Sequence, residues 1–449
     1  MVLNRASSKK STAERIRSPI FSGISLLLIL CPIYLAAQEK IPGEYSLRIV
    51  EIGPGDEFFS WWGHLAVMVD NELTGESLCY DFGVFSFDDP HLVRNFLKGD
   101  LNYKILVSTA PDELEWYIRN NRDITVYTLN LDDRKKEQIV YALNWNALPE
   151  NRNYAYKVFT DNCVRRIIRI IDHALEGKFI EKYENEKGRF TLREHAERHL
   201  YRSVVMYGFL NFIMGEEIDK PLSRFDEMYL PAEFTEALVD FTYTDAKGNI
   251  QALVSSIEKI NTALGRPAVL PRPPPGELYA FLAGMTGAGI LILLRMLEKK
   301  KGAFLIVSGI AKSLLSLYWA LAGTVLFYAM LFSHHTYTYN NLNIIYANPL
   351  LFTGVPWGIL CAFTRHEGKR VFYSRALKGL WTYVLAGSML TIVLRIAGVN
   401  YSNNTLNLFL IIPSAVVLSF LGDLAAAAYK RCLAVGTDAP RGQSETHHA

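Results

Sequence analysis

The chain is poor in cysteine and has no concentrated charge of either sign. Five cysteines are scattered over 449 residues: Cys31, Cys79, Cys163, Cys361 and Cys432. This spacing excludes a disulfide scaffold and a cysteine-rich metal cluster, and we expect neither a metal nor a cofactor. The net charge is +2, and no long basic tract occurs beyond the N-terminus and short loops, so nothing indicates a nucleic-acid partner.

Hydrophobic residues are abundant instead: they make up 50% of the sequence and are unevenly distributed. Roughly the first 270 residues have the composition of a soluble α+β protein, and the remainder has that of a membrane domain. The predicted division is a signal peptide or signal anchor at residues 1–37, an exported domain at 38–265, a proline-rich linker at 266–277, a transmembrane domain at 278–430 and a disordered cytoplasmic tail at 431–449.

The N-terminal segment has the plan of an export signal. Basic residues between Arg5 and Arg17 precede an apolar run from Phe21 to Leu35, and Ala36-Ala37 supplies small residues for cleavage. A cleaved signal peptide and an uncleaved anchor are both compatible with this pattern. In either case the domain that follows is exported.

Five apolar stretches have lengths suited, or nearly suited, to crossing a bilayer. They cover Leu278–Leu297, Phe304–Phe332, Leu350–Phe363, Leu380–Ile396 and Leu408–Tyr429. The third is short, and we expect it to borrow residues from its flanks. The prolines between Pro267 and Pro275 form a stiff spacer before the first of these spans.

The charges of the connecting loops orient the spans. Basic residues follow the first span at 299–301, the third between 365 and 378, and the fifth at 430–431, whereas the loops 333–349 and 398–407 contain no Lys or Arg. By the positive-inside rule the basic loops are cytoplasmic. We therefore predict a multi-pass protein of the bacterial cytoplasmic (inner) membrane with its exported domain in the periplasm.

Within the exported domain, alternating and β-branched runs predict a sheet interrupted by helices. The predicted strands are Tyr45–Ile52, Leu65–Val69, Leu78–Phe82, Tyr103–Val107 and Thr125–Leu129, and the predicted helices lie near 90–98, 111–120 and 131–146. Residues 203–216 are apolar but too short to span a membrane. They form either a buried helix or an interfacial helix that enters the outer leaflet.

Cys163 is the most informative residue for chemistry. A predicted strand at 154–160 leads into a helix whose apolar residues recur with helical spacing after Cys163. Asp161 and Asn162 are helix-capping residue types, so the sulfur lies at the helix N-terminus. The free backbone N–H groups there favour a thiolate, which is the reactive form of a nucleophilic cysteine.

A cysteine nucleophile needs a base and a group that orients the base. His64 follows Gly63 at the start of a predicted strand, and we assign it as the base. Asp81 lies on the next predicted strand and is the candidate third member, with Asp56 and Glu57 as alternatives.

The remaining histidines of the exported domain are interpreted as surface residues: His91, His173, His195 and His199. A structural disulfide between Cys163 and Cys79 is the competing interpretation of the cysteine, because export makes such a bond possible.

Together these motifs resemble the Lnb-type lipoprotein N-acyltransferases, in which a periplasmic domain is joined to a membrane domain. The segments that carry the resemblance are Gly55–Ser60 with Gly63-His64, Asp81–Phe87, Gly99–Tyr103, Tyr154–Tyr156, Asp161–Cys163 with Arg166, Gly208, Gly215–Asp219, Leu230-Pro231, and His335 with Asn341, Asn343 and Asn348–Leu350. The likeness extends over most of the chain after residue 37.

The resemblance implies a fold, a reaction and further site residues. The order of histidine before cysteine is similar to that of permuted papain-like folds of the NlpC/P60 and lecithin–retinol acyltransferase groups. The implied reaction moves an acyl chain from a phospholipid through a thioester on Cys163 to the N-terminal amine of a diacylated lipoprotein. The implied substrate-binding residues are Arg166, His335, Asn341 and Asn343.

Two other functions remain open at this stage. A Cys–His hydrolase acting on peptides or lipids at the periplasmic membrane surface would use the same catalytic residues with water as the acceptor. A non-enzymatic membrane sensor or assembly protein would instead use a structural bond between Cys79 and Cys163.

Overall fold

The computed structural model describes residues 44–85, 90–245, 247–298, 302–425 and 427–428. The predicted signal segment at 1–37 and the predicted tail at 431–449 therefore lie outside the described residues. The elements below all belong to one compact unit that begins at Tyr45.

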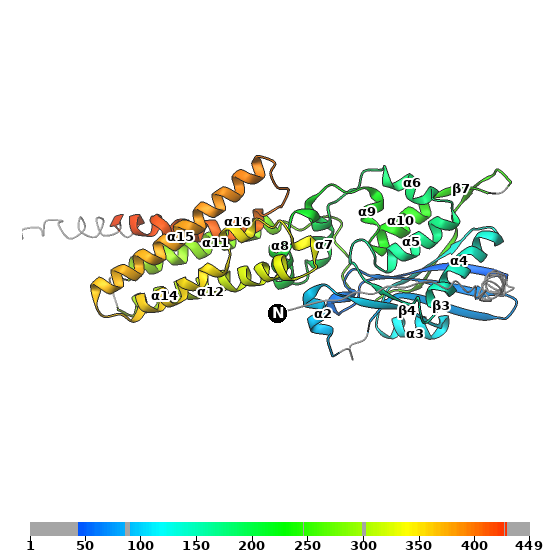
Figure 1. The fold of residues 1–449 in the computed structure, drawn as a ribbon, viewed down its shortest axis with the longest axis horizontal. Helices are drawn as coiled ribbons and strands as arrows, with labels where there is room; N and C mark the ends of the chain where they lie inside the picture. Colours follow the sequence, from blue (N-terminus) through cyan, green and yellow to red (C-terminus); the bar gives the residue numbers. More distant parts are fainter. Residues whose placement is uncertain (1–43, 86–89, 246, 299–301, 426, 429–449) are drawn as a thin grey trace, which may run out of the picture. The chain divides into compact units, whose positions relative to one another are not determined.

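A seven-stranded antiparallel sheet forms the centre of the exported domain (Figure 1). Its strand order is β6-β4-β3-β2-β1-β5-β9. The strands are β1 (Tyr45–Ile52), β2 (His64–Asn71), β3 (Glu76–Val84), β4 (Asn102–Thr109), β5 (Ile124–Leu129), β6 (Asn153–Ala155) and β9 (Val254–Asn261). The five predicted strands are thus confirmed, because each lies within one of the observed strands.

Nine helices accompany this sheet in the described part of the exported domain. They are α2 (Leu92–Lys98), α3 (Ala110–Arg119), α4 (Asp133–Ala147), α5 (Cys163–Ala174), α6 (Lys178–Glu184), α7 (Leu192–Leu200), α8 (Val204–Ile213), α9 (Arg224–Glu227) and α10 (Pro231–Asp240). A small hairpin, β7 (Thr242–Thr244) with β8 (Ile250–Ala252), follows α10.

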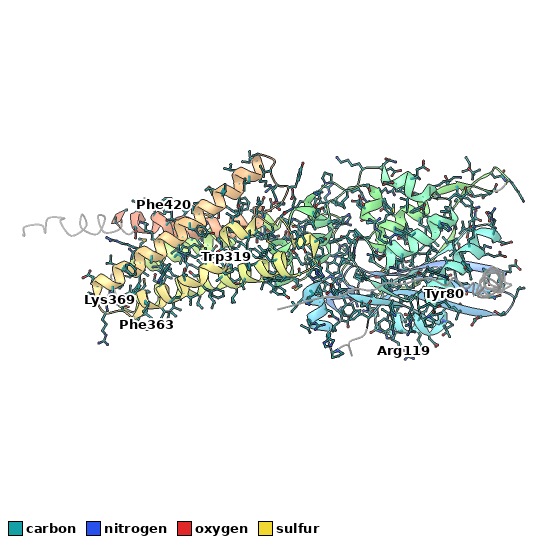
Figure 2. The ribbon with its side chains drawn as sticks, in the orientation of Figure 1. Tyr80, Arg119, Trp319, Phe363, Lys369 and Phe420 are labelled. Atoms are coloured by element: carbon teal, nitrogen blue, oxygen red, sulfur yellow. The ribbon has the colours of Figure 1, made fainter. Side chains whose placement is uncertain are left out.

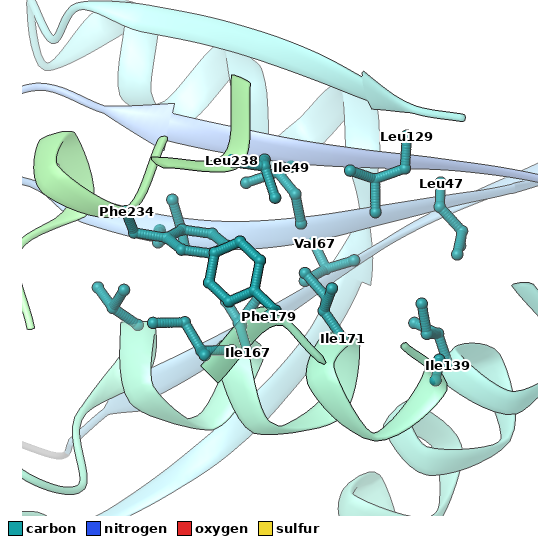
Figure 3. Packing of buried hydrophobic residues seen from close by; sticks show 14 of the residues in the cluster. Leu47, Ile49, Val67, Leu129, Ile139, Ile167, Ile171, Phe179, Phe234 and Leu238 are labelled. Atoms are coloured by element: carbon teal, nitrogen blue, oxygen red, sulfur yellow. The ribbon is translucent and has the colours of Figure 1, made fainter. Parts of the chain in front are cut away.

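Both faces of the sheet are covered, because side chains alternate along each strand. Leu47, Ile49 and Val67 pack on one face against residues of α4, α5 and α10, including Ile167 and Phe234 (Figure 3). The opposite face carries a smaller cluster, in which even-numbered residues of β1 and β2 pack against α3. Each fully buried aliphatic side chain contributes about 1.5–3 kcal/mol to this core.

One strand prediction was wrong at its far end. The predicted strand at 154–160 is limited to β6, Asn153–Ala155. After Tyr156 the chain turns, because the amides of Thr160 and Asp161 both donate to the carbonyl of Lys157. This turn brings residues 161–163 back to the sheet, so that α5 begins beside β3.

Five helical segments of the described chain are long and apolar enough to span a membrane. They are α11 (Gly276–Leu297), α12 (Gly302–Phe332), a third segment over Asn343–Phe363, α15 (Glu367–Ile396), and a fifth over Thr405–Ala425. The third joins α13 (Asn343–Tyr346), the 3₁₀ turn Pro349–Thr353 and α14 (Gly354–Phe363), so it borrows residues from its N-terminal flank as predicted. The fifth begins as α16 (Thr405–Val416).

Small residues bring the membrane helices close together. A side chain at Gly309 of α12 would collide with the carbonyl of Gly358 on α14, so the two backbones touch at this crossing. Trp319 of α12 is buried in the bundle, whereas Phe363 and Lys369 lie near the connection from α14 to α15 (Figure 2). The sheet-containing domain is therefore followed by a packed helical membrane domain.

Candidate catalytic site

Cys163 is the first residue of α5, and its location is determined by Asn162. The Asn162 side chain accepts a hydrogen bond from the Arg165 amide at 3.0 Å, which caps the helix. The same side chain donates to the carbonyls of Val158 at 3.0 Å and Tyr229 at 2.8 Å. Cys163 is 6% exposed at this helix start. The prediction of a cysteine at a capped helix N-terminus is confirmed.

His64 and Asp81 form a close pair on adjacent strands. His64 begins β2 after Gly63, which has a φ of 79°, a conformation that favours glycine. Asp81 is aligned with Ala66 on the β2–β3 ladder, so it lies diagonally across from His64. Its Oδ1 is 2.6 Å from His64 Nε2, and Tyr117 donates its hydroxyl to Asp81 Oδ2 at 3.2 Å.

Cys163 and His64 both lie beside Gly83, so the structure brings all three predicted catalytic side chains together. Burial lowers the pKa of His64, but the Asp81 carboxylate, the Cys163 sulfur and hydrogen bonds to both outweigh burial and raise this pKa well above its usual value. The raised pKa favours the protonated form of His64.

Gly83 leaves the space between these groups open. Its φ is 96°, and a Cβ atom there would lie 3.7 Å from Cys163 Cβ and 3.8 Å from both His64 Cε1 and Tyr156 Cε2. A larger residue would occupy the volume beside the sulfur and would also strain the backbone. The glycine therefore preserves room for a reacting group between Cys163 and His64.

A row of aromatic rings extends from this centre toward the surface, and we call it the aromatic row. Tyr156 stacks on Tyr103 at 4.2 Å between ring centroids, and Tyr103 contacts Phe85 at 5.1 Å. Phe85 in turn meets Phe59 at 5.6 Å, and Phe59 is 53% exposed. An apolar path thus connects the thiol's surroundings with the protein surface.

A cavity of about 130 Å³ opens beside the outer part of the aromatic row. Phe85 and Tyr103 line it together with Leu92 and Asn95 of α2. His335 of the loop 333–349 contacts the same helix, because its Nε2 is 2.8 Å from the carbonyl oxygen of Phe96. The cavity wall is therefore supported by a residue that follows a membrane helix.

The predicted substrate contacts are engaged with other protein groups. Arg166 pairs with Asp161 at 2.9 Å, and its guanidinium lies over the Tyr154 ring at 3.7 Å from the centroid. The Nδ2 atom of Asn341 donates to the carbonyls of Phe212 and Met214 at 2.8 and 3.0 Å.

Asn343 Nδ2 likewise donates to the Phe212 carbonyl at 2.8 Å, and Asn343 is fully buried. These amides join the loop 333–349 to the end of α8. A role of Arg166, His335, Asn341 and Asn343 in substrate binding stays a prediction.

Among the alternatives for the orienting carboxylate, the geometry favours Asp81. Asp56 lies at the surface and pairs with Arg266 at 2.7 Å, a hydrogen bond that lowers the pKa of Asp56. Glu57 precedes a 3₁₀ turn at Phe58–Ser60 and makes no side-chain capping bond there.

Cys79 and Cys163 are both free thiols in the structure, which argues against the structural disulfide. Cys79 is packed in the cluster between the sheet and α3. In the described part of the chain, no group of His, Cys, Asp and Glu side chains is arranged to hold a metal ion.

The surface interpretation was wrong for two histidines. His195 is fully buried and His199 is 8% exposed. His195 Nε2 is 3.0 Å from Glu227 Oε1, and its Nδ1 is 3.0 Å from Arg198. The partners of His195 come from α9 and from the next turn of α7, and His199 Nδ1 is 2.7 Å from the carbonyl oxygen of His195, so the polar sequence around both residues reflects a buried polar cluster. Tyr117, which holds Asp81, was not predicted, because its helix shows only an ordinary amphipathic pattern.

Comparison with known proteins agrees with this geometry. Residues 42–198 match the family model described as the Lnb N-terminal periplasmic domain, and the matched segment includes Cys163, His64 and Asp81. No curated protein and no solved structure gives a significant match. The resemblance found in the sequence motifs is thus confirmed for residues 42–198, which are similar to the Lnb N-terminal periplasmic domain.

Proposed function

We propose that the protein is an acyltransferase that moves a fatty acyl chain from a phospholipid to the N-terminal amine of a diacylated lipoprotein, through a thioester on Cys163. The observation that carries the proposal is the His64–Asp81 contact of 2.6 Å beside a thiol at a helix N-terminus. Nucleophilic acyl transfer by a cysteine requires a base beside the thiol and an acidic group that orients the base, and these three groups are present here.

In the first half-reaction the Cys163 thiolate attacks the ester carbonyl carbon of the phospholipid. The C–O bond of the ester breaks as the C–S bond forms, and the protonated His64 donates its proton to the departing lysophospholipid oxygen. The raised pKa of His64 suits this step, because the imidazole enters the reaction already protonated. Asp81 stabilises the imidazolium before the transfer and holds its ring.

In the second half-reaction the lipoprotein amine attacks the thioester carbonyl. Neutral His64 removes a proton from the attacking nitrogen, the C–S bond breaks, and the amide forms while Cys163 returns to the thiolate. We assign the backbone N–H groups of Cys163 and Val164 to the oxyanion of both tetrahedral intermediates. As the first residues of α5 they have no partner within the helix.

The proposal extends to the fold and to the division of the chain. A cysteine at the start of α5 facing a histidine at the start of β2 supports a permuted papain-like arrangement of the NlpC/P60 or lecithin–retinol acyltransferase kind. We propose residues 38–265 as a periplasmic catalytic domain, 266–277 as a linker and 278–430 as a transmembrane domain. Both substrates carry lipid chains, so attachment to the inner membrane replaces a three-dimensional search.

The aromatic row is the proposed place of the transferred acyl chain. Tyr156 lies beside Cys163 and Gly83, and the row leads from there to the exposed ring of Phe59. An alkyl chain along these rings would keep its carbonyl carbon near the sulfur and would exclude water from the thioester. Exclusion of water is what separates acyl transfer from hydrolysis.

The test uses the purified full-length protein with phospholipid vesicles carrying an isotope-labelled acyl chain and a diacylated lipopeptide. Mass spectrometry of the lipopeptide is expected to show a labelled N-acyl group. Cys163→Ser and His64→Ala are expected to abolish it, while Cys79→Ala and the surface change His173→Ala retain it. Labelled free fatty acid with unmodified lipopeptide would assign the same residues to a hydrolase, and retained transfer in Cys163→Ser would overturn the mechanism.

A further inference from the structure

A second cavity, of about 340 Å³, lies between the membrane helices at the end of α11. Residues of α11, α12, α14 and α15 line it, together with Val417 and Leu418 at the end of the fifth span. The span α11 follows the exported domain and linker, and it reaches the cavity near its C-terminal end, with Leu291, Arg295 and the C-capping residue Glu298. The cavity therefore belongs to the membrane face opposite the exported domain, and it is separate from the Cys163 site.

Charged groups in the cavity wall form an incompletely neutralised network. Glu298 is 5% exposed and bonds to Arg295 and to Lys312, whose Nζ is 3.0 Å away. Asp423 bonds to Arg295 at 2.7 Å and to Lys378 at 3.1 Å. With Arg370 and Glu367, which also line the cavity, four cations face three carboxylates, so the cavity wall carries one net positive charge. A net positive charge in the wall of a cavity attracts an anion.

Arg370 adds a donor that the described protein does not use. It is half-buried on α15 and lines the cavity, and its guanidinium has no hydrogen bond or ion pair with any described residue. Trp381 of the same helix also lines the cavity and is fully buried, and its indole N–H has no acceptor in the part of the chain described. A buried donor such as the Trp381 indole N–H normally has a partner, and the unpaired guanidinium of Arg370 is available to a ligand that accepts hydrogen bonds.

The remainder of the wall is apolar, and part of its backbone is unusual. Leu305, Val371 and Leu418 supply aliphatic surface beside the charges. The fifth span changes here from α16 to a π-helical turn at Val417–Leu421. Such π-helical turns are uncommon in proteins, and those that do occur often lie at functional sites. A ligand of this cavity therefore combines an anionic head with apolar substituents.

We propose that this cavity binds the phosphate head group of an anionic phospholipid from the leaflet opposite the exported domain. The guanidinium of Arg370 has the planar geometry that matches two phosphate oxygens, and the surplus charge of the network attracts the same group. The cavity volume falls within the range of about 300–1,000 Å³ that is usual for small-molecule sites. Basic pockets between membrane helices bind lipid head groups in this way.

The experiment is native mass spectrometry of the delipidated full-length protein in detergent, titrated with phosphatidylglycerol or with phosphatidylcholine of the same chains. Preferential binding of one phosphatidylglycerol is expected. Arg370→Gln is expected to weaken it roughly fivefold, whereas Arg375→Gln, an exposed cation of the same helix outside the cavity lining, leaves it unchanged.

A second variant tests the cavity without changing its charge. Leu305→Trp fills the space from α12, and it is expected to reduce phosphatidylglycerol binding as Arg370→Gln does. Equal binding of the two lipids, or equal losses in Arg370→Gln and Arg375→Gln, would contradict the proposal. Displacement of the lipid by millimolar inorganic phosphate would assign the site to free phosphate and would also overturn it.

Discussion

Asp81→Asn is the change that tests the catalytic geometry most directly. The substitution keeps the size of the side chain and removes the charge that faces His64 Nε2 at 2.6 Å. Two unit charges about 4 Å apart attract by about 4 kcal/mol at an effective dielectric constant near 20. Loss of that attraction destabilises the imidazolium, and it corresponds to a decrease of about a thousandfold in the rate of acyl transfer.

The raised pKa of His64 also predicts the direction in which the rate of thioester formation changes with pH. The pKa of His64 is raised, so its proton is held at low and neutral pH and is lost only as the pH rises through that raised value. The first half-reaction needs this proton, so the rate of thioester formation should fall on the alkaline side. In Asp81→Asn the pKa of His64 decreases, because the carboxylate no longer raises it, and the alkaline limb moves to lower pH.

The assay is single-turnover formation of the Cys163 thioester, followed by intact-protein mass spectrometry across the pH range. Asp56→Asn is the matched control, since that carboxylate lies at the surface and pairs with Arg266. A decrease of less than tenfold in Asp81→Asn with an unshifted alkaline limb would refute the assigned role of Asp81. So would an equal decrease in Asp56→Asn.

Three further changes test other parts of the site. Asn162→Ala removes the cap of α5 and should destabilise the protein by about 1–2 kcal/mol, which a lower thermal midpoint of unfolding would show. Acyl transfer should decrease as well. An unchanged thermal midpoint would contradict the capping role. Phe85→Ala interrupts the aromatic row and should slow the transfer of long acyl chains more than that of short ones, measured by competition between labelled phospholipid donors. An equal effect on all chain lengths would show that the acyl chain does not lie along the row. Asn341→Ala removes one donor from each of the buried carbonyls of Phe212 and Met214, which keep bonds from Asn343 and Arg193, and it should cost about 0.5–1.5 kcal/mol. The loss is measured as increased hydrogen exchange at the end of α8, and protection equal to the parent would argue against a structural junction.

Patterns among neighbouring residues were sufficient to predict much of the secondary structure and the membrane spans. The alternation of β1 to β5 and the helical spacing after Cys163 are properties of neighbouring residues, and these elements appear where they were predicted. The apolar length that defines a membrane span is equally local. The strand β9 was missed, because it is an edge strand with mostly exposed residues and has no alternating apolar signal.

The arrangement of the site depended on contacts between distant segments. Tyr117 reaches Asp81 across 36 positions, and no feature of its own helix indicates that contact. The burial of His195 likewise depends on Glu227, which lies 32 positions later. Residue types suggested Cys163 and His64, but only the folded sheet and α5 show that the two side chains lie beside the same glycine, Gly83.

The asparagine bonds between the loop 333–349 and α8 have a mechanical consequence. Backbone carbonyls near Phe212 accept from both Asn341 and Asn343, so a loop that belongs to two membrane helices is fastened to the exported domain by buried contacts. If the proline-rich segment before α11 were the sole connection, the sheet-containing domain could change its orientation relative to the membrane helices. If the proposed function is correct, these contacts fix the height of Cys163 relative to the membrane surface, and the lipid substrates must extend to that height. Thicker or thinner bilayers should therefore alter turnover even when every side chain of the active centre is intact.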